Sequence, residues 1–260
     1  MSEPDRNSQV ATLRALHVPG DPVVLPNVWD AASARVAEKA GFPALATTSG
    51  GVAKSLGFRD GEDAPVDEML AAVSRITGAV GVPVTADMES GYGLPAPELV
   101  ERLADAGACG LNFEDTDHAT GGLRDVAEQA ERVAALRAAC DEQGADLVIN
   151  ARVDVFVRGE GTEAERMPDG LARAQAYVEA GADSIFPILL AGESTIRDFV
   201  SAVDAPLNIY LRQECPPLAR LADLGVARVS FGSSLMGLAL ERLNQVVEAL
   251  RKGDASAFGG

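Results

Sequence analysis

The stretch VPVTADMESGYG, residues 82–93, begins as an apolar strand and ends in two carboxylates, Asp87 and Glu89, before a glycine-rich turn. Successive side chains of a strand alternate between its two sides, so Asp87 and Glu89 point the same way. Two like charges that converge inside a barrel or sheet repel unless they are protonated, solvated or bridged by a cation. The stretch therefore predicts a buried strand with an acidic site at its carboxyl end.

The rest of the chain repeats one unit, in which a short apolar strand alternates with an amphipathic helix. Five of the helices end in a glycine that leads directly into the next strand, as in KAGFPAL, DAGACGL, EQGADLV, EAGADSI and DLGVARV. Glycine takes the left-handed conformation at low cost, so it commonly follows the last helical turn. The expected strands are residues 23–30, 44–49, 82–89, 109–115, 146–154, 184–189, 206–211 and 228–233.

Eight such units in 260 residues have the size and order of a (β/α)8 TIM barrel, which is the fold that we predict. A doubly wound open sheet of the same α/β class is the alternative. No break in composition divides the chain, so residues 1–260 are expected to form one domain. Its ends, residues 1–9 and 253–260, are expected to be mobile.

The composition limits the classes of partner. Hydrophobic residues make up 47% of the chain, enough for a large core, and the formal net charge is −17. Nucleic acids and anionic membranes attract basic surfaces, so neither is an expected partner. Three cysteines without CxxC spacing, a polar start and the lack of a long apolar run predict a soluble, cytoplasmic protein.

Polar side chains gather at the predicted carboxyl ends of the strands, where barrels of this kind carry their chemistry. Asp87 and Glu89 end one strand, and Glu114 ends the next. Carboxylates suit a hard divalent cation, so we expect these three to bind Mg²⁺, with Mn²⁺ as a second option. The alternative for each acid is a solvated loop position. With only two histidines in the chain, a histidine-based zinc site is not expected.

Other residues at the same end are candidates for binding an anionic substrate. The backbone N–H groups of Ser49, Gly50 and Gly51, in the segment TTSGG, can surround a carboxylate, although glycines after a strand are also ordinary turn residues. Arg152 offers a forked guanidinium for carboxylate or phosphoryl oxygens, with a structural ion pair as its alternative.

Three further side chains complete the candidate set. Asn112 lies on the same strand as Glu114, and Trp29 either packs over a substrate or fills the rim of the barrel. His118 lies in TDHATGG, a segment with the glycines of a mobile lid. It is either a general acid or base or an exposed loop histidine without a role.

Taken together, these segments resemble the isocitrate lyase/phosphoenolpyruvate mutase superfamily, and its phosphoenolpyruvate phosphonomutase-like branch in particular. The resemblance covers residues 27–236 and is carried by NVWDAASARVAEKAGFPALATTSGGVAKSLGFRDGE, ADMESGYG, NFED, NARVD and RVSFGSSLM. It implies an Mg²⁺-dependent barrel enzyme and a homotetramer, or dimer, that exchanges its last helix between subunits. It also implies a small 2-oxo acid or phosphonate as the substrate.

The resemblance assigns roles to individual residues. Residues 49–51 match the segment that binds the substrate carboxylate, and Arg152 matches the arginine on its carboxylate or phosphoryl group. Asp60, in GFRD, matches an acid beside the metal and the carboxylate-binding loop. The metal-site acids of the family are matched by Asp87, Glu89 and Glu114.

After the fourth strand this chain departs from the family pattern. The lyases carry a KKCGH-type loop there, and the mutases carry a loop with lysine and asparagine, whereas this chain reads EDTDHATGGLRD. We expect an Mg²⁺-dependent lyase, hydrolase or mutase that acts on a small 2-oxo acid through an enolate-like intermediate, with a C–C or P–C bond broken or formed. The alternatives are a 2-oxo acid binding protein without turnover and a class II pyruvate aldolase.

Overall fold

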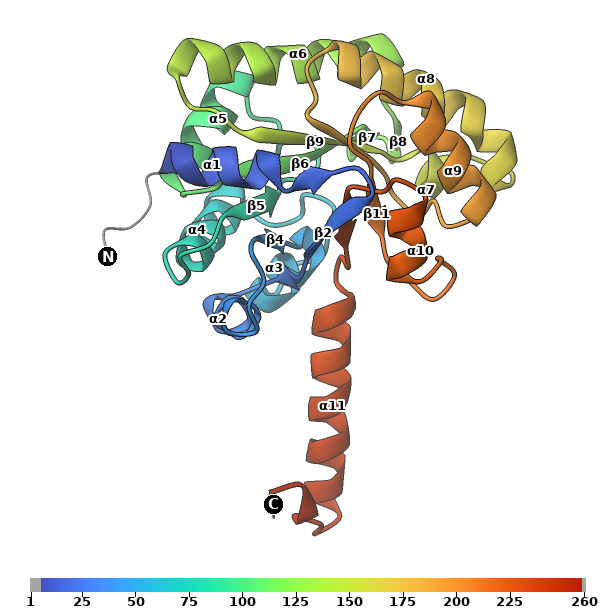
Figure 1. The fold of residues 1–260 in the computed structure, drawn as a ribbon. Helices are drawn as coiled ribbons and strands as arrows, with labels where there is room; N and C mark the ends of the chain where they lie inside the picture. The colour runs from blue at the N-terminus through green and yellow to red at the C-terminus, as the bar shows by residue number, and fades with distance from the viewer. Residues whose placement is uncertain (1–5, 259–260) are drawn as a thin grey trace.

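Eight parallel strands close into a barrel in the computed structural model, which describes residues 6–258 (Figure 1). The first strand is interrupted at Pro26, which has no N–H to donate to a sheet. Its first half, β2 (Asp21–Leu25), pairs with the last strand, and its second half, β3 (Asn27–Val28), pairs with the next. The others are β4 (Leu45–Thr47), β5 (Val84–Asp87), β6 (Gly110–Glu114), β9 (Val148–Val153), β10 (Ser184–Pro187), β11 (Asn208–Tyr210) and β12 (Arg228–Ser230).

The pairing order confirms the predicted barrel and rules out the open sheet. One run of pairs extends from β3 through β4, β5, β6 and β9 to β10, and another joins β2, β12 and β11. A parallel bridge between Ile185 and Leu207 connects β10 to β11 and completes the circle. The short strand β1 (His17–Val18) adds to β2 in the antiparallel direction.

Helices follow the strands around the outside of the barrel. All five glycines predicted to end helices, at positions 41, 107, 144, 181 and 225, have positive φ angles. The helices are α2 (Ala31–Lys39), α3 (Ser49–Leu56), α4 (Val66–Thr77), α5 (Ala96–Asp105), α6 (Val126–Gln143), α7 (Val155–Arg158), α8 (Glu163–Glu179), α9 (Glu193–Ala202), α10 (Leu218–Asp223) and α11 (Ser234–Arg251), followed by the 3₁₀ turn η1 (Ser256–Phe258). None of them, among the residues described, is long and apolar enough to cross a membrane.

An additional helix, α1 (Arg6–Ala15), covers the amino-terminal end of the barrel. Its residues Val10 and Leu13 are buried against Leu25 and Val148. Arg6 donates hydrogen bonds to the carbonyl oxygens of residues 108 and 146, which precede β6 and β9. Residues 6–9 were expected to be mobile, and these contacts correct that expectation; residues 1–5 and 259–260 lie outside the described part of the chain.

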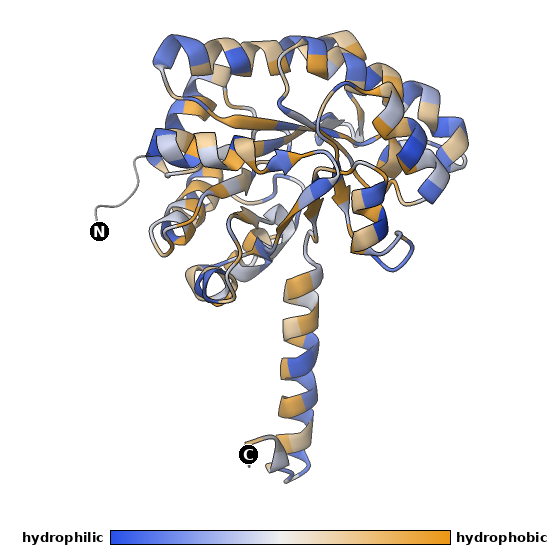
Figure 2. Cartoon of the chain, in the orientation of Figure 1, coloured by the Kyte–Doolittle hydropathy of each residue, from blue (hydrophilic) through white to orange (hydrophobic). Residues whose placement is uncertain are grey.

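At the other end of the chain, α11 leaves the barrel and extends away from it (Figure 1). Apolar residues recur along this helix (Figure 2), and most of those beyond its first turn are exposed. Leu243 is 56% exposed and Val247 is 52% exposed. Where α11 begins, Leu235 and Ala239 line an apolar groove with α2 and Trp29, with a volume of about 520 Å³. The last helix therefore leaves part of the outer surface of its own barrel uncovered.

Replacing Gly110 with Ala should destabilise the barrel. A Cβ atom at Gly110 would lie 2.6 Å from the carbonyl oxygen of Val148 on the adjacent strand, so the backbone must shift. We expect a loss of about 1–3 kcal/mol in the free energy of unfolding, measured with urea. Gly237→Ala is the control, because no atom lies within 4 Å of its added Cβ. Equal stability of the two variants would contradict the close approach at Gly110.

Candidate active site

A cavity of about 200 Å³ opens at the carboxyl ends of the barrel strands. One side of it is polar and includes Asp60, Asp87, Asn112 and Arg152. Parallel register brings these residues together, because Asp87 pairs with Asn112, and Glu114 pairs with Arg152, across neighbouring strands. The opposite wall consists of Phe186, Ile188 and Tyr210, together with small polar residues.

Asp87 presents a carboxylate oxygen that no other group of the described chain satisfies. Its Oδ2 accepts a hydrogen bond of 3.0 Å from the N–H of Ser49, and its own N–H donates to Thr47 Oγ1 at 2.8 Å. Its Oδ1 is buried and has no hydrogen-bond partner among residues 6–258. A buried anionic oxygen of this kind is costly without a partner, so the site fits a cation there.

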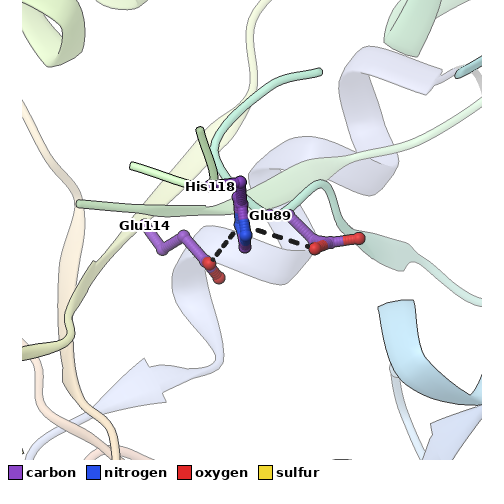
Figure 3. A group of neighbouring side chains, drawn as sticks. All are labelled: Glu89, Glu114 and His118. Atoms are coloured by element: carbon purple, nitrogen blue, oxygen red, sulfur yellow. Dashed lines mark hydrogen bonds and ion pairs between the residues drawn. The ribbon is translucent and has the colours of Figure 1, made fainter. Parts of the chain in front are cut away.

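Glu89, Glu114 and His118 form a second group beside the cavity (Figure 3). The Nε2 atom of His118 lies 2.9 Å from Glu114 Oε1 and 3.5 Å from Glu89 Oε2. One ligand atom from each of the three side chains lies within 4.8 Å of the others, a spacing that can hold a metal ion. The sequence grouped Asp87 with the two glutamates, whereas the structure brings His118 between them.

His118 is therefore not an exposed loop residue. It follows β7 (Thr116–Asp117) at the start of a turn that ends at β8 (Gly122–Leu123), and the two strands pair as a hairpin. This hairpin points His118 down onto the acids, and the mobile lid suggested by the glycines stays a prediction.

The pKa values of the acids are raised because the cluster is buried. Burial, with the charges of Asp60 and Asp87, raises the pKa of Glu89 to about 7 against the opposing effect of the hydrogen bond from Tyr92. Burial raises the pKa of Glu114 to about 8, although Arg152 lies 2.5 Å away. Burial and the charge of Asp87 raise the pKa of Asp60 as well. Without a divalent cation, the cluster therefore retains protons near neutral pH.

Glu62 stabilises the turn that carries Glu89, and the sequence analysis missed it. Its carboxylate Oε1 accepts hydrogen bonds from the N–H groups of Ser90 and Tyr92 at 3.0 and 2.7 Å. Its own N–H donates to Glu89 Oε2 at 2.8 Å. Glu62, Glu89 and Tyr92 all have positive φ angles, of 59°, 48° and 55°. Strained backbone of this kind persists where surrounding contacts impose it. The signal in the sequence was the position of Glu62 directly after GFRDG.

Arg152 forms the ion pairs that the sequence analysis gave as its alternative role. Its Nε and Nη2 atoms donate to Asp154 at 2.6 and 2.7 Å, and Nη2 also contacts Glu114. The guanidinium nonetheless lines the cavity, and its Nη1 makes no hydrogen bond to residues 6–258. The ion pairs thus orient the side chain and leave one donor for a ligand.

The segment at residues 49–51 forms the first turn of α3 at the edge of the cavity. Two of the three N–H groups already have partners in the protein, since that of Ser49 donates to Asp87 and that of Gly51 to Thr48 Oγ1. A Cβ on Gly50 would lie 2.9 Å from Asp60 Oδ2, so a side chain at this position would displace the Asp60 carboxylate. Ligand binding by all three N–H groups therefore stays a prediction, and it requires those of Ser49 and Gly51 to exchange a protein partner for the ligand.

Trp29 does not line the cavity. Its side chain lies in the apolar groove between α2 and the start of α11, on the outer face of the barrel. The sequence places it at the end of a strand but does not give the direction of its ring.

Phe186 and Ile188 do line the cavity, and they were not predicted from the sequence. They are alternate residues at the end of β10, and this spacing could have indicated that both point inward.

Comparison with known proteins identifies the family. The sequence profile of phosphoenolpyruvate phosphomutase matches residues 13–251. The 2-methylisocitrate lyase of Escherichia coli is 34% identical over 236 residues, which cover 83% of this chain and 78% of the relative. The chain belongs to the phosphoenolpyruvate mutase/isocitrate lyase superfamily. The two matches, a phosphomutase and a 2-methylisocitrate lyase, are enzymes of the classes that the resemblance implied.

Solved structures of the superfamily have the same fold. A Burkholderia cenocepacia protein, described provisionally as a phosphonomutase, superposes with a TM-score of 0.88 and 44% sequence identity, over 93% of this chain and 100% of that one. Oxaloacetate acetylhydrolase, solved with its product oxalate, gives a TM-score of 0.82 at 25% identity, over 94% of this chain and 87% of that one. The TIM barrel and the family expected from the sequence are both confirmed.

Raising the pH should reduce the stability of the metal-free protein through Glu89. The pKa of this group is about 7 in the folded state against a usual value of 4.5, so the folded state binds more protons between these values. Stability therefore falls as the pH rises from about 5 to 7, with a slope that approaches about 1.4 kcal/mol per pH unit for one group.

The measurement is urea unfolding in chelator at several pH values, for the wild type and Glu89→Gln. The difference in unfolding free energy, wild type minus variant, should decrease up to pH 7 and then level off. The exposed Glu193, whose pKa is lowered by Arg220, provides a control, because Glu193→Gln should give a constant difference over the same range. A pH-independent difference for Glu89→Gln would contradict the raised pKa.

Proposed function

We propose that this chain is an Mg²⁺-dependent lyase, hydrolase or mutase that acts on a small 2-oxo acid through an enolate-like anion. The observation that carries the proposal is the unpaired, buried Oδ1 of Asp87 beside the Glu89–Glu114–His118 group. Hard divalent cations prefer carboxylate ligands, and Mn²⁺ can replace Mg²⁺ in such a site. When bound, the cation would stabilise negative charge on the 2-oxo oxygen as the bond breaks.

Side chains at the cavity would bind the cation, bind the substrate and carry the proton. Asp87, Glu89 and Glu114 hold the cation, directly or through water, and Asp60 lies beside them at the edge of the cavity. The unoccupied Nη1 of Arg152 donates to the carboxylate or phosphoryl group of the substrate. His118 holds a proton next to Glu114, and its pKa is raised by that hydrogen bond, so it can deliver the proton to a departing group.

The cavity limits the size and charge of the substrate. Arg152 is the one cationic side chain among the lining residues, and Phe186, Ile188 and Tyr210 form the opposite wall. A tricarboxylate would place an uncompensated charge against this apolar wall, which is unfavourable. We therefore favour a small oxaloacetate-like or phosphonopyruvate-like substrate over isocitrate or methylisocitrate. The loop after the fourth strand, EDTDHATGGLRD, supports this choice because it lacks the KKCGH-type sequence of the lyases.

The first test is metal-dependent release of pyruvate, followed by a coupled dehydrogenase. Oxaloacetate, phosphonopyruvate, methylisocitrate and 4-hydroxy-2-oxo acids are offered separately, with Mg²⁺ or with chelator. We expect release from one of the smaller compounds with Mg²⁺ only, and at least a hundredfold loss in Asp87→Ala, because removing a metal ligand removes the main stabilisation of the anion.

Calorimetry of oxalate binding separates this proposal from two alternatives. A binding protein without turnover would bind oxalate with Mg²⁺ and release no product from any compound. A class II pyruvate aldolase would instead condense pyruvate with an aldehyde. Oxalate binding that is unchanged in Asp87→Ala and Glu114→Ala would contradict the site itself.

We also propose that α11 packs against the barrel of a second subunit, within a homotetramer or dimer. Leu240, Leu243, Val247 and Leu250 are spaced three or four residues apart, so they form one apolar stripe on the helix. The groove beside α2 offers apolar surface of the kind that this stripe could cover. The three free thiols agree with a reducing compartment, and we place the enzyme in the cytoplasm.

Leu243→Glu should shift the assembly towards smaller species. A charge in the middle of the stripe would be desolvated when the helix packs, which weakens association. Light scattering after size-exclusion chromatography measures the mass, with Asn244→Glu, outside the stripe, as the matched control. A monomeric wild type, or equal masses for both variants, would contradict the exchange of α11.

A further inference from the structure

A buried arginine lies inside the barrel, beneath the cavity, and has no role in the scheme above. Arg228, on β12, is completely buried and makes no ion pair with the residues described. Two of its nitrogen atoms, Nε and Nη1, have no hydrogen-bond partner among residues 6–258. Its third, Nη2, crosses the interior to β6 on the opposite wall and donates to Asn112 Oδ1 at 3.1 Å. Burial lowers the pKa of Arg228 to about 10, so it remains charged at neutral pH.

This contact determines which way the amide of Asn112 faces. A guanidinium can only donate hydrogen bonds, so the atom facing Arg228 must be the amide oxygen. Asn150 Nδ2 donates to the same oxygen at 2.8 Å, and Asn150 is oriented in turn by Ser184 Oγ, which donates to its Oδ1 at 2.7 Å. With its oxygen held by two donors, Asn112 has only its Nδ2 group available, and Asn112 lines the cavity.

We propose that Arg228 is a positioning residue that holds Asn112 so that its amide N–H group donates to an anionic oxygen of the substrate. The arginine also places a positive charge below the cavity without touching the ligand. With a neutral, apolar residue in its place, Asn150 alone would hold the Asn112 oxygen, so the amide N–H group would be directed at the cavity less firmly. This inference rests on the proposed function, since it concerns the anion that binds in the same cavity.

A physical comparison supports a functional role over a structural one. A buried, unpaired charge is expensive, and apolar residues of similar volume generally fill a barrel interior at lower cost. The acid whose charge acts on Arg228 is Asp87, which lies in the cavity rather than in the interior. The positive charge of Arg228 therefore acts on the cavity. An anionic ligand bound there would be attracted to it, as Asp87 is.

The test is the binding of oxalate, a small planar dianion, in the presence of Mg²⁺, measured by calorimetry on the full chain. Arg228→Met should weaken binding about tenfold, the loss typical of one hydrogen bond to a charged group. Arg228→Lys, which keeps a charged donor, should stay within about threefold of the wild type. Asn112→Ala should also weaken binding, and the loss in the double variant should be smaller than the sum of the two single losses, because both residues act through one amide.

Controls separate positioning from a general loss of structure. Arg137→Met removes an arginine that pairs with Asp183 at the far end of the barrel, and it should leave oxalate binding unchanged. Thermal unfolding reports whether each variant folds; if Arg228→Met does not, Arg228→Leu replaces it, since an aliphatic side chain also lacks the donor. Wild-type affinity in these variants, or additive losses in the double variant, would overturn the proposal. Failure of the wild type to bind oxalate would instead count against the proposed function.

Discussion

Carboxylates in a low-dielectric space repel one another, and the donors at the mouth of this barrel reduce that repulsion. Each acid there has one oxygen that accepts from a donor in a different part of the chain: the Tyr92 hydroxyl at 2.6 Å for Glu89, the Ser49 N–H for Asp87, and Arg152 for Glu114. The raised pKa values of Glu89 and Glu114 show that these donors do not neutralise the cluster completely. A divalent cation would supply the positive charge that the cluster of acids still lacks.

The parallel barrel makes this arrangement possible because strand register places residues distant in sequence at one level. Asn112 lies beside Asp87 and Asn150 through two consecutive pairs of strands, and Glu114 lies beside Arg152. Side chains at alternate positions point inward, so one level carries Asp87, Asn112, Asn150 and Ser184, and the level above carries Glu114 and Arg152. Arg228 donates to Asn112 at the lower of these levels and is fully buried, so its charge acts strongly on the cavity.

Much of the fold was predictable because it depends on repeated, local signals. The eight strands and the five helix-ending glycines follow from periodicity and from the left-handed conformation that glycine tolerates. The acids at the strand ends were predictable for the same reason, since alternation gives the face of each residue. Alternation does not give rotamers or loop paths. His118 was placed by a hairpin, Trp29 by the direction of its ring, and Arg228 lies on a strand where an apolar residue was equally compatible with the pattern.

The distribution of charge explains how an acidic protein can bind an anion. A net charge of −17 repels an approaching 2-oxo acid, but surface charges act over only about 8 Å at physiological ionic strength. Arg152 and Arg228 are buried, so salt screens their attraction far less, and they act at the short distances where the ligand is bound. Affinity should therefore depend on these two arginines and the cation rather than on the surface, and long-range steering contributes little to the rate of association.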